Sequence, residues 1–182
     1  MKRSIISAAV LSSFFMSAVA FAAVGDVYDS GVLKINGKVV GTTCQFVDSN
    51  TAEISLNEVG MDKLSSLTVG QAYTPVVNGT QLPLRIKCEG NKTPRVTFSA
   101  SQFDDKKVTF NNGDAKGVGF AVYYGKDNQQ IDPAGNMDLD LVKNANGEYE
   151  LNFFARYARL NNSDAVKAGS VSSTLTLTVV TD

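Results

Sequence analysis

The chain has 182 residues, of which 43% are hydrophobic, and 17 basic against 18 acidic residues give a net charge of −1. This near-neutral balance argues against binding to nucleic acid or to an anionic membrane surface. The sequence contains no histidine, so it lacks the usual general base of enzymes and a common metal ligand.

The N-terminus has the pattern of a secretory signal peptide. Lys2 and Arg3 precede a long apolar run, and Ala20-Phe21-Ala22 at its end fits the small-x-small rule for cleavage. We expect residues 1–22 to be removed and the mature chain to begin at Ala23, with a net charge of −3. A membrane anchor is the alternative, but the run is short for a span and serines interrupt it. About 160 residues then remain, enough for one domain with a hydrophobic core.

The first predicted strand follows a polar segment at residues 23–30. One parity of the extended segment from Val27 to Ile35 carries, in order, Val27, Asp29, Gly31, Leu33 and Ile35. This alternation predicts a strand with a glycine at its centre. After Gly37 the parity shifts, as expected where a glycine bend or bulge redirects a strand.

Cys44 and Cys88 are the only cysteines, and both lie in the secreted part. An even count in a secreted chain predicts a disulfide, which in the chain-entropy model stabilises the fold by roughly 4 kcal/mol. A metal site built on two cysteines would need further ligands, and the sequence has no histidine to supply them. We therefore predict a disulfide, no metal and no cofactor.

Short alternating segments follow one another along the rest of the chain. They lie at 53–57, 82–88, 96–100, 108–110, 118–124 and 149–157, with a short helical turn or loop at 61–70. Gly117-Val118-Gly119 lacks the third glycine of a phosphate-binding turn and predicts a strand in close contact with a neighbour. Seven or eight short strands separated by turn signals predict an all-β, immunoglobulin-like sandwich in a single domain.

Carboxylate pairs are the remaining candidates for catalysis. Asp138 and Asp140 share one strand parity, and Glu148 and Glu150 share another. Acidic residues that flank turns on a β-protein surface are more typical of solvated charge than of a catalytic pair. The sequence therefore does not indicate an enzyme.

The last fourteen residues, Gly169 to Asp182, predict a strand that ends the chain. One parity is apolar, and serine and threonine residues dominate the other. The apolar residues are Val171, Leu175, Leu177 and Val179. Such a strand must pair with an earlier segment or with another molecule. If it is the next-to-last strand of a seven-stranded sandwich, the fold is incomplete and has an open sheet edge beside a hydrophobic groove.

Several motifs of the chain resemble those of one protein family. They are GVLKINGKVVGTTC at the first cysteine, LPLRIKC at the second, GVGFAV, FFARY, and a glycine fourteenth from the end. In order and spacing they resemble the structural pilins of chaperone-usher fimbriae, close to the major subunit of type 1 fimbriae. The resemblance spans the whole mature chain. One residue departs from the family pattern, because Thr181 stands where an aromatic residue is usual.

The resemblance implies an incomplete sandwich whose final strand is supplied in trans by donor-strand complementation. Residues 23–36 would be the N-terminal extension and 37–182 the pilin domain. The donor face would comprise Val27, Asp29, Gly31, Leu33 and Ile35. The acceptor groove and chaperone-docking strand would comprise Gly169, Val171, Leu175, Leu177, Val179 and Asp182.

The implied function is that of a structural subunit of a surface fimbria, reached through the periplasm. Its partners would be identical or related pilins, a periplasmic chaperone and an outer-membrane usher, without nucleic acid or direct membrane insertion. Two alternatives stay open at this point. The chain could be a minor adaptor or terminator subunit, or a secreted binding module whose N-terminal arm folds back on its own body.

Overall fold

The computed structural model describes residues 31–39, 44–75, 78–79, 82–89, 94–125, 129–134, 141–161 and 164–181. The predicted signal peptide, Val27, Asp29 and Asp182 lie outside these residues, as do Asp138 and Asp140.

The regular secondary structure of the described chain is almost entirely β-strand. They are β1 (Gly31–Val39), β2 (Cys44–Val47), β3 (Thr51–Leu56), β4 (Asn78–Gly79), β5 (Leu84–Cys88), β6 (Pro94–Phe98), β7 (Val118–Tyr124), β8 (Gln129–Gln130), β9 (Glu148–Leu151), β10 (Phe153–Arg159) and β11 (Val171–Thr181). The helical elements are α1 (Met61–Ser65), within the segment expected to form a short turn, and a 3-10 turn at Ala100–Gln102.

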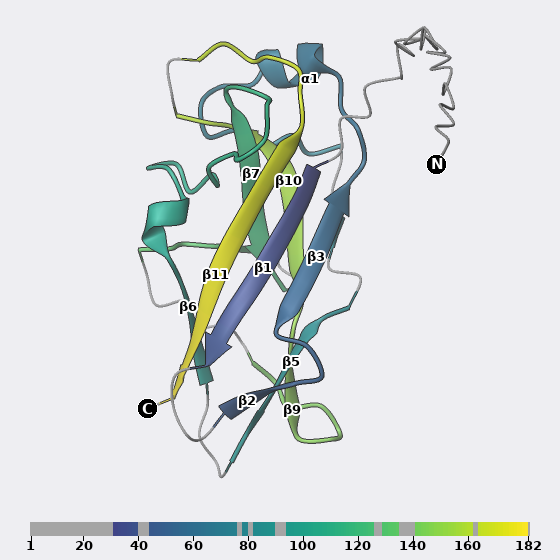
Figure 1. Ribbon diagram of the computed structural model, residues 1–182, viewed down its shortest axis with the longest axis vertical. Coiled ribbons are helices and arrows are strands. Elements are labelled where there is room, and N and C mark those ends of the chain that lie inside the picture. The colour runs from purple at the N-terminus through teal and green to yellow at the C-terminus, as the bar shows by residue number, and fades with distance from the viewer. Residues whose placement is uncertain are drawn as a thin grey trace, which may run out of the picture.

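The strands form two packed layers (Figure 1). One layer is the sheet β3-β1-β11-β6, and the sheet β4-β10-β7-β8 lies behind it. A third, three-stranded sheet, β2-β5-β9, lies at the end of the molecule opposite α1. The prediction of an all-β, immunoglobulin-like sandwich is confirmed.

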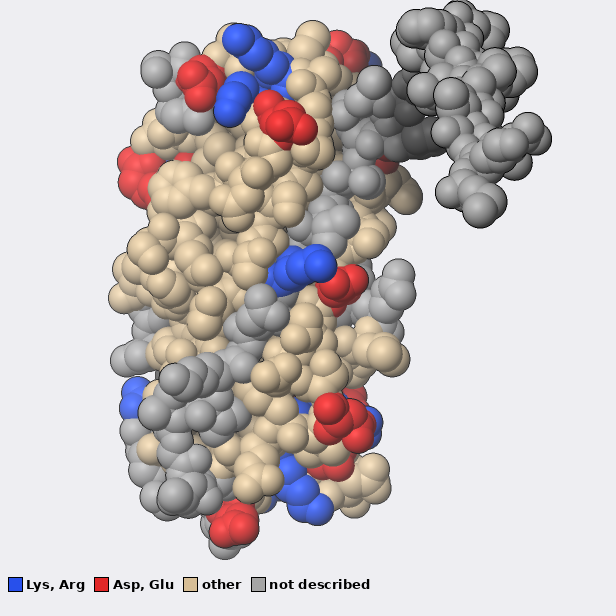
Figure 2. All heavy atoms as spheres, in the orientation of Figure 1, with Lys and Arg blue, Asp and Glu red and all other residues tan. Residues whose placement is uncertain are grey.

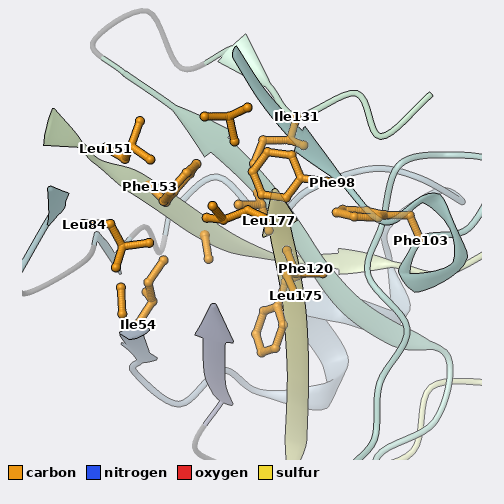
Figure 3. Close-up of a cluster of buried hydrophobic side chains, with 14 of the residues drawn as sticks. Ile54, Leu84, Phe98, Phe103, Phe120, Ile131, Leu151, Phe153, Leu175 and Leu177 are labelled. Atoms are coloured by element: carbon orange, nitrogen blue, oxygen red, sulfur yellow. The ribbon is translucent and has the colours of Figure 1, made fainter. Parts of the chain in front are cut away.

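Alternation along the strands builds the core between the layers. Every second residue of β3, β5, β6 and β11 is buried, which is the pattern of strands with one face toward a core. In Figure 3, Leu177 of β11 lies close to Phe98 and Phe153. The rings of Phe98 and Phe153 meet edge to face with centroids 5.8 Å apart, a favoured geometry for aromatic pairs. Through the core, the C-terminal strand β11 thus contacts side chains of its own sheet and of the facing sheet.

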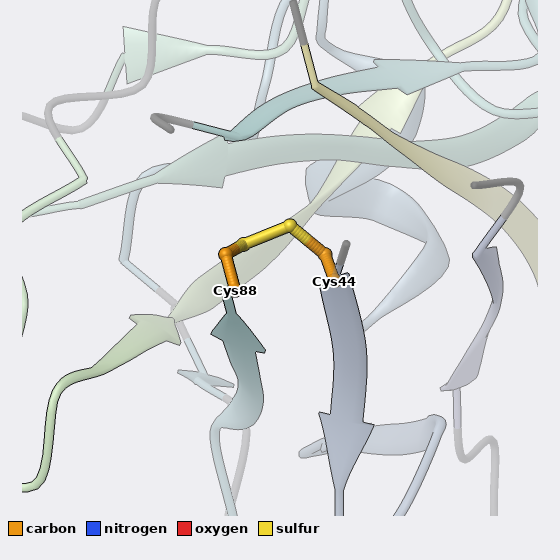
Figure 4. The surroundings of a disulfide bond; sticks show 2 residues. All are labelled: Cys44 and Cys88. Atoms are coloured by element: carbon orange, nitrogen blue, oxygen red, sulfur yellow. A yellow bond between two sulfur atoms is a disulfide. The ribbon is translucent and has the colours of Figure 1, made fainter. Parts of the chain in front are cut away.

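The predicted disulfide is confirmed. Cys44 opens β2 and Cys88 closes β5, and the two residues stand directly opposite each other in the antiparallel β2–β5 ladder (Figure 4). The bond therefore ties together the ends of two neighbouring strands, 44 residues apart in sequence.

Some predicted strand boundaries are wrong. The long strand expected over 149–157 is divided at Asn152, because β9 pairs with β5 while β10 pairs with β7 in a different sheet. The segment 108–110 forms only isolated bridges. Leu82 lies outside β5 with 80% of its surface exposed, and Ala100 begins the 3-10 turn instead of extending β6.

Candidate functional site

The candidate site is β11 with the strand position beside it. Val171, Leu175, Leu177 and Val179 are all buried, each at most 5% exposed, on the face of β11 that packs on the core. Gly169 lies just before β11 with φ +150°, and a Cβ there would come within 2.6 Å of the Ala115 nitrogen. The residues predicted to form the groove wall therefore share one face.

One edge of β11 is occupied by the chain's own N-terminal arm. β1 pairs with β11 in parallel from Gly31 opposite Val171 to Val39 opposite Val179, and it pairs antiparallel with β3 on its other side. On the β3 side, Lys34 Nζ lies 3.3 Å from Glu53 Oε1, and both side chains are about half exposed. Within this single chain, the arm thus fills the strand position between β3 and β11.

Side-chain amides cover most of the other edge of β11. β6 pairs only with Leu177–Thr181. Further up the strand, Gln102 accepts a hydrogen bond from the Thr176 amide (2.8 Å) and donates one to the Thr174 carbonyl (2.9 Å). Asn111 Oδ1 likewise accepts from the Ser172 amide at 2.8 Å. These side-chain amides fill the hydrogen-bonding positions that a longer β6 would occupy. A partner strand could therefore pair with β11 only along the edge that β1 occupies.

Ser173 interrupts the apolar row of β11, although it is only 1% exposed. Its hydroxyl donates to the Phe110 carbonyl at 2.6 Å and lies 2.8 Å from Thr109 Oγ1, which in turn accepts from the Phe120 amide at 3.0 Å. Sequence reasoning missed Ser173, yet its parity with Val171 was the available signal. The hydrogen-bond partners of Gln102 and Asn111 left no such signal, because they depend on how distant segments pack.

An apolar pocket lies beside the first residue of β11. Its lining joins the turn before the strand to α1 and to two strands of the rear sheet. The lining includes Val59, Met61, Leu64, Ala115, Val118, Tyr157, Val166 and Val171. The site therefore offers apolar surface and backbone hydrogen-bonding groups.

Two carboxylates of the described chain have a shifted pKa, and each is paired with a lysine. A hydrogen bond from Lys63 lowers the pKa of Asp62, and one from Lys107 lowers the pKa of Asp132; both carboxylates are exposed. Glu148 accepts from Arg85 at 3.4 Å within an ion-paired cluster. Among the described residues there is no group of three or more potential metal ligands of the His, Cys, Asp and Glu types.

Charge and hydropathy add little to this description. Figure 2 shows acidic and basic side chains scattered over the viewed face, without a large region of either sign. Within the described ranges, no helix has both the length and the apolar character needed to cross a membrane.

Comparison with known proteins gives consistent matches. The model of the family described as "Fimbrial protein" matches residues 33–181. The uncharacterized fimbrial-like protein YehD of Escherichia coli strain K12 is 33% identical over 187 aligned positions, covering the whole of both chains. The crystal structure of the CupB6 tip adhesin from Pseudomonas aeruginosa aligns with a TM-score of 0.44 and 13% identity, over 81% of this chain and 39% of the adhesin.

The family match covers every strand that surrounds the candidate site, from Leu33 in β1 to Thr181 at the end of β11. Fimbrial proteins are structural or adhesive components of surface appendages and are not enzymes. With the full-length relative at 33% identity, the two matches agree in family. This chain therefore belongs to the fimbrial protein family, as a structural or adhesive subunit.

Proposed function

We propose that the chain is a shaft subunit that polymerises head to tail by donor-strand exchange. Its N-terminal arm, with Val27, Asp29, Gly31, Leu33 and Ile35 as the donor face, would leave its own groove and enter that of the next subunit. The carrying observation is that the position between β3 and β11 is filled by a segment from the start of the chain. Such a segment can be exchanged without unfolding the rest of the sandwich.

The connection of the arm supports a specific direction of exchange. β1 ends level with Val179, near the C-terminal end of β11, and only residues 40–43 join it to Cys44. This linker spans at most about 18 Å from Val39 to Cys44. An arm that fills its own groove is therefore held parallel to β11 by its tether.

An arm from another subunit has no such constraint. If it ran parallel to β11, the donor's body would lie at the end of the acceptor that already holds β2 (Figure 1). If it ran antiparallel, the donor's body would lie at the opposite end, near α1. Repeating that contact stacks subunits head to tail, and such a heterologous contact builds an open filament.

The strength of the exchanged junction comes from burial and backbone pairing. In a reversed arm the pairing with β11 becomes antiparallel and the pairing with β3 becomes parallel, so the arm keeps one neighbour of each kind. Burying Leu33 and Ile35 contributes roughly 1.5 to 3 kcal/mol each, in addition to the backbone ladder. A junction of this kind dissociates very slowly.

The predicted signal peptide supports the same scheme. The signal peptide would direct the chain to the periplasm, where a chaperone strand would occupy the groove until an outer-membrane usher brings the next subunit. Val171, Leu175, Leu177 and Val179 would then form the docking wall, and Asp182 would contribute its carboxylate to a basic cleft of the chaperone. The fibre would end at the cell surface.

A second candidate follows from the pairing of β1 within its own chain. A subunit whose arm stays in its own groove would be a stable secreted monomer with a binding role. An adaptor in the same fimbria would keep both the arm and the groove. A terminator would dispense with a usable arm, which the regular β1 ladder argues against.

The test removes the arm's contribution and follows surface fibres by electron microscopy. Deletion of residues 23–30 and the substitution Leu33→Asp should each abolish or shorten the fibres, while Lys34→Gln, at an exposed position of β1, should leave them intact. Unchanged fibres in both lesions would reject donor-strand exchange. A purified protein that lacks residues 23–39 and still folds readily would reject any need for the arm in completing the fold.

The groove is tested by Leu177→Asp, which places a carboxylate in the core beside Phe98 and Phe153. An unpaired buried charge is costly, so the variant should fail to accumulate in the periplasm. Thr178→Asn, on the opposite face of β11, is the matched control. Normal accumulation of the Leu177 variant would count against the groove.

A further inference from the structure

A surface cavity of about 360 Å³ lies beside the turn between β2 and β3. Its wall combines three apolar residues with three charged ones. They are Val47, Leu82, Pro83, Asp48, Arg85 and Glu150. Leu82 is 80% exposed, so a large apolar side chain at this cavity is in contact with water. We call this site the Leu82 cavity.

The charged part of the wall is negative. Arg85 Nη1 lies 3.4 Å from Glu148 Oε2, and Arg85 Nη2 pairs with Asp48. Glu150 is exposed and adds a third carboxylate, so one positive and three negative groups leave a charge of −2. Lys87, which stands opposite Glu148 in the β5–β9 ladder, does not line the cavity. The Leu82 cavity therefore suits a cation that carries an apolar chain, as lysine does.

Two lysines elsewhere on the molecule lack a partner for their charge. Lys116 and Lys167 stand opposite each other in an antiparallel bridge, with backbone hydrogen bonds of 3.2 Å in both directions, and both are exposed. Within the described ranges, neither ammonium group takes part in an ion pair. Like charges directly opposite each other on neighbouring strands are destabilising. A carboxylate from outside the subunit would relieve this repulsion.

We propose that the Leu82 cavity receives the side chain of Lys116 or Lys167 from another copy of the chain in the fibre. The inference rests on the proposed function, because it needs subunits that assemble. In this contact the alkyl stem of the lysine packs against Leu82, and its ammonium group lies beside Asp48 and Glu150. The contact satisfies an exposed apolar side chain and an unpaired charge at the same time.

The two surfaces lie too far apart to meet within one subunit. Lys167 lines the apolar pocket next to α1, whereas the Leu82 cavity borders the sheet β2-β5-β9 at the opposite end (Figure 1). A contact between two different surfaces is heterologous, and repeating it adds subunits in one direction. It therefore has the polarity of a head-to-tail fibre. Because no residue of β1 or β11 lines the cavity, the contact is separate from the strand groove and limits how one body rotates against another.

The experiment treats assembled fibres with a carbodiimide, which joins an amine and a carboxylate in contact as an amide. Fibres grown from a mixture of nitrogen-15-labelled and unlabelled subunits let mass spectrometry identify cross-links between copies, because these peptides have mixed isotope composition. We expect such cross-links from Lys116 or Lys167 to Asp48 or Glu150. They should be lost in K116Q/K167Q. The control K106Q, at an exposed lysine that pairs with an aspartate of its own chain, should keep them.

A second pair of variants tests the cavity itself. Leu82→Ser removes part of the apolar wall without changing a charge, and the exposure of Leu82 means that folding should not be disturbed. We expect the yield of these cross-links to fall by about threefold, as when part of an apolar contact is lost. Val142→Ser, at a residue that is 79% exposed and does not line the cavity, is the matched control and should leave the yield unchanged. Equal yields in the two variants would show that no lysine stem packs against Leu82, and would overturn the inference.

The inference and the proposed function fail in distinguishable ways. Fibres in which neither lysine is cross-linked to Asp48 or Glu150 of another copy would overturn the inference and leave donor-strand exchange in place. The deletion of residues 23–30 and Leu33→Asp test that exchange separately. If both lesions leave the fibres unchanged, donor-strand exchange fails, whereas cross-links at the Leu82 cavity would still establish this contact between copies.

Discussion

At the scale of single residues, a chain of hydroxyl groups joins β11 to the segment before β7. The Phe120 amide donates to Thr109, the Thr109 hydroxyl lies 2.8 Å from that of Ser173, and Ser173 donates to the Phe110 carbonyl. Both hydroxyl residues are buried, so losing one leaves the other with an unsatisfied polar group.

We predict that Ser173→Ala lowers the free energy of unfolding by about 1–3 kcal/mol, the usual cost of an unpaired buried polar group. When Thr109→Val is added to the Ser173→Ala variant, the further loss of unfolding free energy should be smaller than the loss that Thr109→Val causes in the unsubstituted protein. The reason is that the two hydroxyls share one hydrogen bond. Urea unfolding of both single variants and the double variant measures this coupling. Strictly additive losses would show that the two hydroxyls act independently.

Gly119 is a second residue whose role is local. A Cβ at this position would come within 2.0 Å of the Thr109 carbonyl oxygen, so β7 approaches its neighbour there as the GVG motif predicted. We expect Gly119→Ala to destabilise by about 3 kcal/mol, the upper end for overpacking. Gly147→Ala is the control, with φ +74° and open space around it, and should cost about 1 kcal/mol. Equal losses in urea unfolding would contradict this difference.

The periodicity of the sequence predicts which residues of β11 are buried, because a strand with one face on a core must alternate. The same reasoning failed for Leu82, which shares the parity of β5 but lies before the strand begins and is 80% exposed. Parity gives the face of a residue only while the strand continues. Where the strand starts is decided by its pairing partners.

At the scale of elements, β11 depends on residues outside any strand. Gln102 is the last residue of the short 3-10 turn, and its side chain hydrogen-bonds two backbone groups of β11. We predict that Gln102→Leu, similar in size, speeds hydrogen exchange of the Thr176 amide at least tenfold. Asn144→Ala, in a distant turn, should leave this amide unchanged. Exchange measured by NMR tests this, and an unaltered Thr176 rate in Gln102→Leu would show that the amide bonds do not hold the edge.

The direction of β1 lay beyond sequence reasoning. An alternating segment pairs equally well in either direction, and the choice here follows from the short connection to Cys44. The division between β9 and β10 has a similar origin, because continuous alternation from 149 to 157 does not reveal a change of sheet. Local pattern thus predicts that a strand exists, whereas tertiary connections decide its partner and direction.

At the scale of the whole molecule, the groove between β3 and β11 is filled from within, and the proposed exchange would fill it from outside. The single chain pairs β11 with its own arm, which covers an edge that would otherwise promote aggregation. In the proposed exchange, the same pairing would have to open before the arm could serve another subunit. Assembly of the free protein would then be limited by release of β1.

This dependence gives a prediction for the double variant N36C/T176C, in which two cysteines at directly opposed positions of the β1–β11 ladder would tie β1 to β11 within one chain. The oxidised monomer should remain soluble and fail to polymerise, because its arm is not released and its groove is not emptied. Reduction under conditions that spare the native disulfide should restore fibre growth, followed by light scattering and electron microscopy. The single variant N36C should grow at the same rate with or without oxidation. Growth of the oxidised double variant at the rate of the unsubstituted protein would mean that β1 can stay in place while subunits join, and that they join through another surface.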